Sequence, residues 1–567
     1  MRKLLALLLT VVMMLSVCGV ASAETAGENV VTIAMETSPN LDTQWNAGST
    51  GAWLMSVMYE GLYSVTATGF ELSGAESVDV NEDATVWTFH LKQNAVWNDG
   101  KAVTANDYVY AFKRLVNPEI ATTYMLDYGQ YLKNGAAISG GEKSVDELGV
   151  TAIDDYTLEI QLENPCTFFD SILTYSAFYP LREDCVVEDG TGNWAWDVSK
   201  SITNGPMKMV ACDEDQEIVY EKSETYYGAA DVALDKLVVK LIDDSNTTLQ
   251  LRETGEVDLI TAYPSEETER LQEAGLYHST PALSTNFLLL QCENEPTSNA
   301  LVRQALSYAI DRDFLCNTLL LGTKTPATAF IGGGFPGSTS EADFRTEGGD
   351  MIGYDPEKAQ SLMAEAGYPN GEGFPVLTCS YANSSADFTT IFEYLQAQWE
   401  EILGITVVLE PLEKASMTTL RDAGDFEVTP QGWGADYMDA SNMLSIFVTG
   451  NFINGGRYSN AEYDAAYNES LKTVDQAERM NLLHKAEQIL LDDMGTIPLY
   501  HGSSVALYSD DTLENVVFGA NGKPLLTGIT HKDSPPERRF GMLPLPNLLS
   551  RRRRGIRRRR SFSRFRR

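Results

Sequence analysis

The sequence predicts a protein of mixed α/β or α+β class that is divided into more than one unit. A chain of 567 residues is long enough for two or three domains. Strand-like alternation of apolar and polar residues occurs early in the chain, and helical spacing dominates later. Because 43% of the residues are apolar and 10% are aromatic, the units can bury sizeable cores, which excludes a disordered acidic polymer.

Two early segments predict strands. In TVWTFHLK, residues 85–92, the side chains of Trp87, Phe89 and Leu91 fall on one face of an extended chain. The segment YTLEIQL, residues 156–162, repeats the pattern. Each segment is therefore expected to form a strand with one buried face.

Two later segments predict helices. In YDPEKAQSLMAEAGYP, residues 354–369, Asp355 suits the N-cap, Pro356 the first turn and Gly367 the C-terminal cap. In NALVRQALSYAIDRDFL, residues 299–315, four apolar residues recur at helical spacing, namely Val302, Leu306, Ala309 and Ile310. Both segments are expected to bury one helical face.

The N-terminus predicts export. Arg2 and Lys3 form a short positive region before an apolar stretch at residues 4–17, and Ala21-Ser22-Ala23 is a small-residue cleavage pattern. The apolar stretch is shorter than the roughly 20 residues that span a bilayer. We therefore expect a cleaved signal peptide and a periplasmic or cell-surface location.

A lipid anchor is the alternative to simple cleavage. The segment LSVC, residues 15–18, resembles a lipoprotein acylation box, although Val17 stands where that box has a small residue. In this alternative, Cys18 would carry the lipid. Plain cleavage after Ala23 is the favoured prediction because of Val17.

The charge distribution divides the chain into an acidic body and a basic end. The formal net charge is −38, but 13 of the 42 Lys and Arg residues follow Pro536, so residues 1–536 carry −50. Such a body repels nucleic acid and anionic membrane surfaces. The end, RRRRGIRRRRSFSRFRR at residues 551–567, has the composition of a nucleic-acid-binding arm, which leaves a nucleic-acid-binding protein as one alternative.

Patterns typical of nucleotide-binding enzymes are present only in fragments. GGGFPG, residues 332–337, fits G-x-G-x-x-G, but Pro336 and the residues after it disfavour a helix start, so a loop is expected. NGKP, residues 521–524, lacks the rest of a phosphate-binding loop. The sequence therefore predicts no nucleotide cofactor.

Histidine and cysteine patterns also predict no catalytic residues and no metal site. The five histidines are scattered, without an H-E-x-x-H motif, and no C-x-x-C pair exists. The sequence leaves open whether the six cysteines after the leader form disulfides; they are Cys166, Cys185, Cys212, Cys292, Cys316 and Cys379. We expect a protein that is not an enzyme and needs no cofactor.

The segment GWGADYMDASN, residues 432–442, is the strongest candidate for a ligand site. Gly432 and Gly434 leave the backbone on each side of Trp433 accessible, and the carboxylate of Asp436 follows. The alternative is an ordinary turn, since Gly and Asp dominate turns.

Whether the segment is a ligand site or a turn, two of its later residues are expected to cap the helix that follows. Asp439 and Ser441 are expected to cap a helix that begins near Asn442.

Five segments together resemble one family, the oligopeptide- and dipeptide-binding receptors of bacterial ABC importers. They follow the family order between Val31 and Lys532. The segments are WNDGKAVTANDYVYAFKRLVNP (97–118), TNGPMKM (203–209), VRQALSYAIDRD (302–313), YDPEKAQSLMAEAGYP (354–369) and GWGADYMDASN (432–442).

The resemblance implies an α/β, two-lobed periplasmic-binding-protein-like fold with an extra subdomain inserted in the first lobe. The boundaries it implies are a signal peptide at 1–23, lobe I at 24–60, 190–283 and 500–532, the inserted subdomain at 61–189, lobe II at 284–499, and a basic tail at 533–567 that is foreign to the family.

By the same resemblance, the protein is an extracytoplasmic receptor that binds short peptides in a closing cleft. It would deliver them, as a monomer, to the integral membrane subunits of an ABC importer. Other members bind nickel complexes, haem or oligosaccharides, so another solute is an alternative, and an exported peptide hydrolase is a second one.

The resemblance also implies roles for single residues. Asp436 aligns with the carboxylate that receives the α-ammonium group of the ligand. Other residues would line the ligand, namely Gly432, Trp433 and Gly434 on one side, Ala47 to Ser49 on the other, and Tyr124 as a further wall. Ala440 stands where the family usually has proline, and no counterpart is evident for the basic residues that some members place at the C-terminal carboxylate of a peptide.

Overall fold

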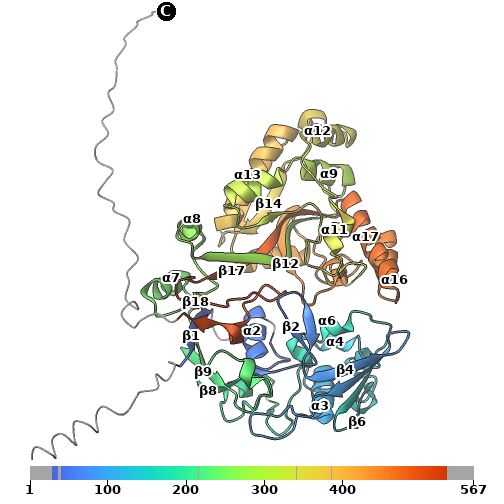
Figure 1. Ribbon diagram of the computed structural model, residues 1–567. Coiled ribbons are helices and arrows are strands. Elements are labelled where there is room, and N and C mark those ends of the chain that lie inside the picture. Colours follow the sequence, from blue (N-terminus) through green and yellow to red (C-terminus); the bar gives the residue numbers. More distant parts are fainter. Residues whose placement is uncertain are drawn as a thin grey trace, which may run out of the picture.

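A computed structural model of the protein describes residues 28–532 except 36–39, 47, 189, 215, 340 and 385. The predicted signal peptide, the acylation box, Ala47 and the basic tail therefore lie outside the described residues. The described chain forms two bodies, one above the other in Figure 1, and two long strands run between them.

One large sheet passes through both bodies, in the strand order β15-β14-β16-β12-β17-β11-β1-β10-β9-β8, with β13 paired to β17. Its strands are β1 (Val30–Met35), β8 (Met207–Asp213), β9 (Glu217–Lys222), β10 (Lys236–Leu241), β11 (Leu259–Ile260), β12 (Tyr277–Leu290), β13 (Thr325–Pro326), β14 (Leu377–Ala382), β15 (Val407–Leu412), β16 (Val428–Gly434) and β17 (Thr496–Leu507).

The two longest strands, β12 and β17, join the bodies. β12 pairs with β17 from Tyr277 to Leu289, while β17 reaches β11 on the first body and β12 reaches β16 on the second. The two largest hydrophobic cores lie on either side of this connection, one around β1, β5 and β10 and the other around β14, α9 and α13. Two separate cores joined by two strands are the arrangement that permits hinge motion.

The predicted early strands are confirmed in a small antiparallel sheet of the first body. Its order is β4-β5-β7-β6, with β4 (Ala75–Val80), β5 (Val86–Leu91), β6 (Val150–Asp154) and β7 (Thr157–Gln161). Trp87, Phe89 and Leu91 on β5 are buried as expected. Helix α3 (Ala105–Val116) packs on this sheet through contacts with β6 and β7.

The predicted caps of the helix at 354–369 are confirmed. In α12 (Pro356–Glu365) the side chain of Asp355 accepts a hydrogen bond from the Lys358 N–H, and Gly367 follows with a φ of 101°. Only glycine adopts such a backbone conformation without strain, and this is the usual way to end a helix.

The predicted continuous helix at 299–315 is wrong in its length. Helix α9 (Ala300–Tyr308) ends early, and α10 (Arg312–Phe314) begins after Asp311, whose side chain accepts from the Phe314 N–H. Asp311 therefore acts as a second N-cap and interrupts the helix. The four apolar residues of the predicted face are all buried.

The remaining helices and short strands surround these sheets (Figure 1). They are α2 (Ser49–Met58), β2 (Tyr63–Val65), β3 (Phe70–Leu72), α4 (Met125–Gly129), α5 (Gly135–Ser139), α6 (Phe169–Ile172), α7 (Ser245–Thr254), α8 (Thr268–Glu273), α11 (Phe344–Gly348), α13 (Ala386–Leu403), α14 (Lys414–Ala423), α15 (Ala440–Ser445), α16 (Ala461–Ser470), α17 (Gln476–Asp492), β18 (Leu513–Glu514) and β19 (Thr530–His531).

The fold also bears on one further prediction and on one question that the sequence left open. Residues 332–337 lie in a loop between β13 and α11, as expected for a chance match to the dinucleotide motif. All six cysteines left open by the sequence are free. Within the described ranges, no helix has both the length and the apolar character needed to cross a bilayer.

Candidate ligand-binding site

The glycine-containing segment forms the end of β16. In the register with β12, Gly432 stands opposite Asn286 and Gly434 opposite Ser284. On the other side, β14 pairs with β16 only at Val428, so no described strand pairs with residues 432–434 on the side away from β12. Both glycines are exposed. This stretch of backbone is thus a short, open sheet edge to which an extended chain could pair.

The two glycines differ in their surroundings. A Cβ placed on Gly432 would lie 2.9 Å from Oδ1 of Asn286, whereas a Cβ on Gly434 would meet nothing closer than the Ser284 Cβ at 3.7 Å. A side chain at residue 432 would therefore require Asn286 to shift, whereas one at residue 434 would meet only ordinary contact.

Asn442 connects Trp433 with Asp436. Its Oδ1 atom accepts one hydrogen bond from Nε1 of Trp433 and one from the backbone N–H of Asp436, both at 3.2 Å. Asn442 is buried in α15, so its side chain is a fixed point for both residues. The sequence offered no signal for this role, because residues 433 and 436 come into reach of residue 442 only after the turn has folded.

The predicted cap of the following helix is half right. Asp439 is the N-cap of α15 and accepts from the Ser441 N–H at 2.9 Å, as expected. Ser441 is not a cap, since α15 begins at Ala440 rather than near Asn442, and Ser441 lies in its first turn. Asp439 also forms a buried ion pair with Arg479, at 2.6 Å between Oδ1 and Nη2.

The same turn contacts the first body. The hydroxyl groups of Tyr437 and Tyr131 lie 3.0 Å apart, and the ring of Tyr437 stacks on Phe168 with centroids separated by 5.9 Å. The guanidinium group of Arg479 lies over the same Phe168 ring, 4.2 Å from its centre. The two bodies therefore touch beside the candidate site.

Tyr124 belongs to an aromatic cluster on the first body. Its ring lies 5.2 Å from Tyr128 and 5.0 Å from Tyr175. Tyr128 is buried, and its hydroxyl has no hydrogen-bond partner among the described residues. Burial, followed by the nearby charge of Asp436, raises the pKa of Tyr128 well above its usual range. The structure thus brings Asp436 close to the cluster that contains Tyr124.

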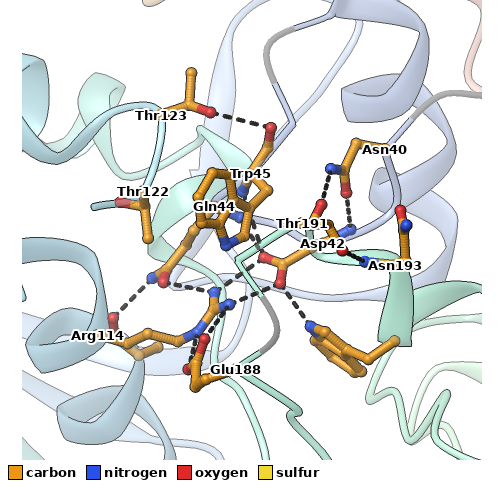
Figure 2. A network of polar contacts seen from close by, with 12 residues as sticks. Asn40, Asp42, Gln44, Trp45, Arg114, Thr122, Thr123, Glu188, Thr191 and Asn193 are labelled. Carbon is orange, nitrogen blue, oxygen red and sulfur yellow. Dashed lines mark hydrogen bonds and ion pairs between the residues drawn. The ribbon is translucent and has the colours of Figure 1, made fainter. Parts of the chain in front are cut away.

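A buried polar network holds the loop that leads to the predicted residues Ala47 and Ser49. Figure 2 shows Asp42 facing Arg114, with 2.9 Å and 2.8 Å between their oxygen and nitrogen atoms. Glu188 accepts from Nε of Arg114 at 2.7 Å. Burial acts against the charged form of Arg114, but Asp42 and Glu188 outweigh it and its pKa is raised.

The network also holds the loop that carries Tyr124. Gln44 donates through Nε2 to the carbonyl groups of Ala111 and Ala177, at 2.7 Å and 3.0 Å. Thr123 donates through its backbone N–H to the carbonyl of Gln44 and through its hydroxyl to that of Trp45 (Figure 2). One set of bonds therefore fixes residues 42–45 and the loop before Tyr124 relative to each other.

The described structure groups five of the predicted site residues. Gly432, Trp433, Gly434 and Asp436 are contiguous, and the aromatic cluster of Tyr124 lies beside Asp436. Ser49 opens α2 on the first body, far from this group in the chain. The sequence analysis missed three contributors to the site, namely Asn442, Tyr128 and Tyr437.

Comparison with known proteins places the chain among binding proteins. Residues 70–455 match the family described as bacterial extracellular solute-binding proteins, family 5 middle. The dipeptide-binding protein DppE of Bacillus subtilis is 30% identical over 493 residues, 86% of this chain and 89% of the relative. The periplasmic oligopeptide-binding protein OppA of Escherichia coli is 30% identical over 84% of this chain and 85% of its own.

A solved structure extends this similarity to the fold. Listeria monocytogenes OppA bound to peptide has a TM-score of 0.71 and 28% identity, and the match covers 90% of this chain and 100% of that one. This similarity confirms the predicted α/β fold of the periplasmic-binding-protein type.

Proposed function

Because the chain belongs to the bacterial extracellular solute-binding proteins of family 5, we propose that it is an extracytoplasmic receptor for short peptides. It binds them in a cleft that closes, and it delivers them to the integral membrane subunits of an ABC importer. Its relatives are named as dipeptide- and oligopeptide-binding proteins, and one related structure holds a peptide, which supports peptides over the other solutes.

The observation that carries this proposal is the open edge at 432–434 beside Asp436. An extended peptide presents N–H and C=O groups along its length, and an unpaired strand edge binds them whatever the side chains are. The α-ammonium group of the peptide loses water on binding and needs a charged acceptor. Asp436 provides one in this proposal, and the aromatic cluster of Tyr124 forms the facing wall.

The remaining parts of the proposal concern the whole chain. Residues 47–49 line the other side of the ligand, the lobe boundaries follow those implied by the family, and the receptor works as a monomer without a cofactor. It acts by binding and release rather than by catalysis. Export directed by residues 1–23 brings it to the periplasm or the cell surface, with a lipid at Cys18 as the alternative form.

Identification of what the purified protein carries tests the proposal. Native mass spectrometry after gentle isolation should detect intact short peptides bound to the protein. Peptide fragments that accumulate with time would indicate a hydrolase instead, and a bound metal chelate or sugar would indicate another solute.

Thermal unfolding gives a second test. At 100 times the dissociation constant, a ligand that binds only the folded state stabilises it by about 2.7 kcal/mol. Mixtures of di- to hexapeptides should therefore raise the melting temperature. The absence of any shift across the mixtures would count against peptides as the ligand.

A further inference from the structure

One side chain of the second body is buried in the core of the first. Tyr437 is 6% exposed and belongs to the hydrophobic core around β1, β5 and β10. Residues on both sides of it in the chain, Ala435 and Ala440, pack instead with the core of the second body. The turn between β16 and α15 therefore inserts one aromatic ring across the contact between the bodies.

Two aromatic residues of the first body receive this ring. Phe168 stacks on Tyr437 with the ring planes 15° apart, and the hydroxyl of Tyr131 lies 3.0 Å from that of Tyr437. Phe168 and Tyr131 also meet each other edge to face, with centroids 6.2 Å apart. The backbone N–H of Glu163 donates to the carbonyl of Tyr131 at 3.0 Å, which ties the segment before Phe168 to Tyr131. The recess for Tyr437 is thus built by the first body alone.

A buried ion pair of the second body contacts the same recess. The guanidinium group of Arg479 lies over the ring of Phe168 and donates two hydrogen bonds to the carboxylate of Asp439, at 2.8 Å and 2.6 Å. Asp439 balances the charge of Arg479, so the cation can be buried against the ring without being left unpaired. A cation over an aromatic face is attracted to it, and more strongly when water is excluded. Phe168 is therefore held by two separate groups of the second body.

These contacts adjoin the candidate ligand site without forming part of its open edge. Tyr437 directly follows Asp436, whose backbone N–H is held by Asn442. The rings of Tyr437 and Phe168 are both buried. Since they contact each other rather than the edge at 432–434, their contribution to holding the bodies together is the same whichever peptide pairs with that edge.

We propose that Tyr437, Tyr131 and Phe168 form a latch between the two bodies that sets how long a bound peptide is retained. When the bodies separate to release a ligand, the ring of Tyr437 leaves its recess and the latch contacts break. The latch therefore slows release without taking part in recognition of the ligand. The inference rests on the peptide-binding function proposed above, and it adds positioning residues that act through the contact between the bodies.

Rates of peptide dissociation test the latch. Radiolabelled tripeptides that differ only in their middle residue (Ala, Lys, Glu or Phe) are bound to the protein and chased with excess unlabelled peptide, and the bound fraction is followed by rapid filtration. Tyr131→Phe removes only the hydroxyl that meets Tyr437, and Phe168→Leu removes the ring but keeps an apolar side chain. The matched control is Tyr394→Phe, which removes a hydroxyl that donates to the carbonyl of Asp311 at 2.8 Å within the second body.

The expected result is a faster release that does not depend on the peptide. Tyr131→Phe should raise the dissociation rate of all four peptides by one common factor of about 2 to 13, the range for a neutral hydrogen bond. Phe168→Leu should raise it at least as much, because it loses the stacked ring and the face under Arg479. Tyr394→Phe should leave the rate unchanged, and the association rates should stay the same in all variants.

Two results of this experiment would overturn the inference while peptide binding stands. Unchanged dissociation in both Tyr131→Phe and Phe168→Leu would show that these contacts do not hold the bodies together. A factor that differs from one peptide to the next would show that the altered residue contacts the ligand instead.

Thiol labelling tests the latch without a ligand. Cys166 is buried on the first body. Burial raises the pKa of its thiol, and the charge of Arg479 opposes that rise, so the thiol lies close to the latch. Cys379 is buried in the core of the second body and reports unfolding of that body. Mass spectrometry after reaction with iodoacetamide gives the labelling rate of each cysteine separately.

Both latch variants should raise the labelling rate of Cys166 and leave that of Cys379 unchanged, and Tyr394→Phe should not raise that of Cys166. Labelling of Cys166 at the wild-type rate in both variants, or an equal rise at Cys166 and Cys379, would refute the latch. If no peptide binds the wild-type protein, the proposed function fails, and this labelling decides the latch alone.

Discussion

At the scale of single residues, the candidate site depends on one buried amide and one carboxylate. Asn442 uses a single oxygen to hold both the indole of Trp433 and the backbone N–H of Asp436, so the backbone that carries the Asp436 carboxylate is held by a residue buried in α15. A charge that is positioned before the ligand arrives costs less to organise on binding. This arrangement favours a binding role for Asp436 over that of an ordinary turn residue.

The role of Asp436 can be measured with a double-mutant cycle. Asp436→Asn should keep the fold and weaken peptides with a free N-terminus by about 1.5–3 kcal/mol, which is roughly 10- to 150-fold in affinity. N-acetylation of the peptide should cost wild type a similar factor and cost the variant much less, because the charged partner is already lost. Calorimetric titrations of the four combinations give the coupling. Equal losses on acetylation in both proteins would show that Asp436 is a turn residue.

The two glycines of the open edge are expected to respond differently to alanine. Gly432→Ala places a Cβ 2.9 Å from Asn286 Oδ1, so the Asn286 side chain must shift, and the free energy of unfolding should fall by about 1 kcal/mol. Gly434→Ala meets only ordinary contact and should change it by less than about 0.5 kcal/mol. Urea unfolding of the two variants measures the difference, and equal values would contradict this account of Gly432.

At the scale of elements, β12 and β17 combine a structural connection with a buried titratable group. His501 on β17 lies 3.0 Å from Oγ1 of Thr285, which stands opposite Trp433 on β16. The Thr285 hydroxyl donates to the carbonyl of Phe330, so it accepts from Nδ1–H of a neutral His501. Burial, and then the charge of Arg345, lowers the pKa of His501 to about 4.

Acid should therefore destabilise this connection. The folded state holds His501 neutral down to about pH 4, whereas the unfolded chain protonates it near pH 6.5, so the unfolded state binds more protons between these values. The contribution is present above pH 6.5 and is lost as the pH falls toward 4, in total about 3 kcal/mol.

Unfolding in urea at pH 4, 5 and 7 measures this dependence of the free energy of unfolding. Comparison with two variants separates the contribution of His501 from that of other groups that titrate in the same range. His501→Gln should flatten the acid-side loss of stability relative to wild type. His90→Gln, at a partly exposed position, is the control and should retain it. An unchanged pH profile in His501→Gln would mean that His501 does not carry the effect.

At the scale of the whole molecule, two bodies with separate cores meet at Tyr131, Phe168 and Tyr437, beside the candidate site. Their connection is two strands rather than a shared core. Closure on a ligand needs bodies that stay rigid while the contact between them changes. Separate cores keep each body rigid, and a connection of two strands lets their contact change.

The basic end of the chain should not take part in binding. Truncation after Lys532 removes the Arg-rich segment and keeps every described residue. Peptide affinity and melting temperature should stay nearly unchanged, as measured by calorimetry and thermal unfolding. DNA binding by the full chain should fall steeply with added salt, because it rests on phosphate neutralisation. A loss of peptide binding on truncation would assign the tail a function in the receptor.

Local patterns in the sequence determined the local structure. The alternation around Trp87 and Phe89 and the caps at Asp355 and Gly367 depend on residues a few positions apart, and the structure confirms them. The open glycines and the acid at 432–436 could be read in the same way, because they lie within five consecutive residues. The helix at 299–315 failed only where Asp311 acts as a second cap.

The tertiary structure alone decided which distant residues meet. Tyr131 and Tyr437 are 306 positions apart, and Asp42 and Arg114 are 72 apart, so no local spacing encodes either pair. Periodicity and capping depend on residues a few positions apart in the chain. Burial and the pairing of charges depend on which distant segments the folded chain brings together.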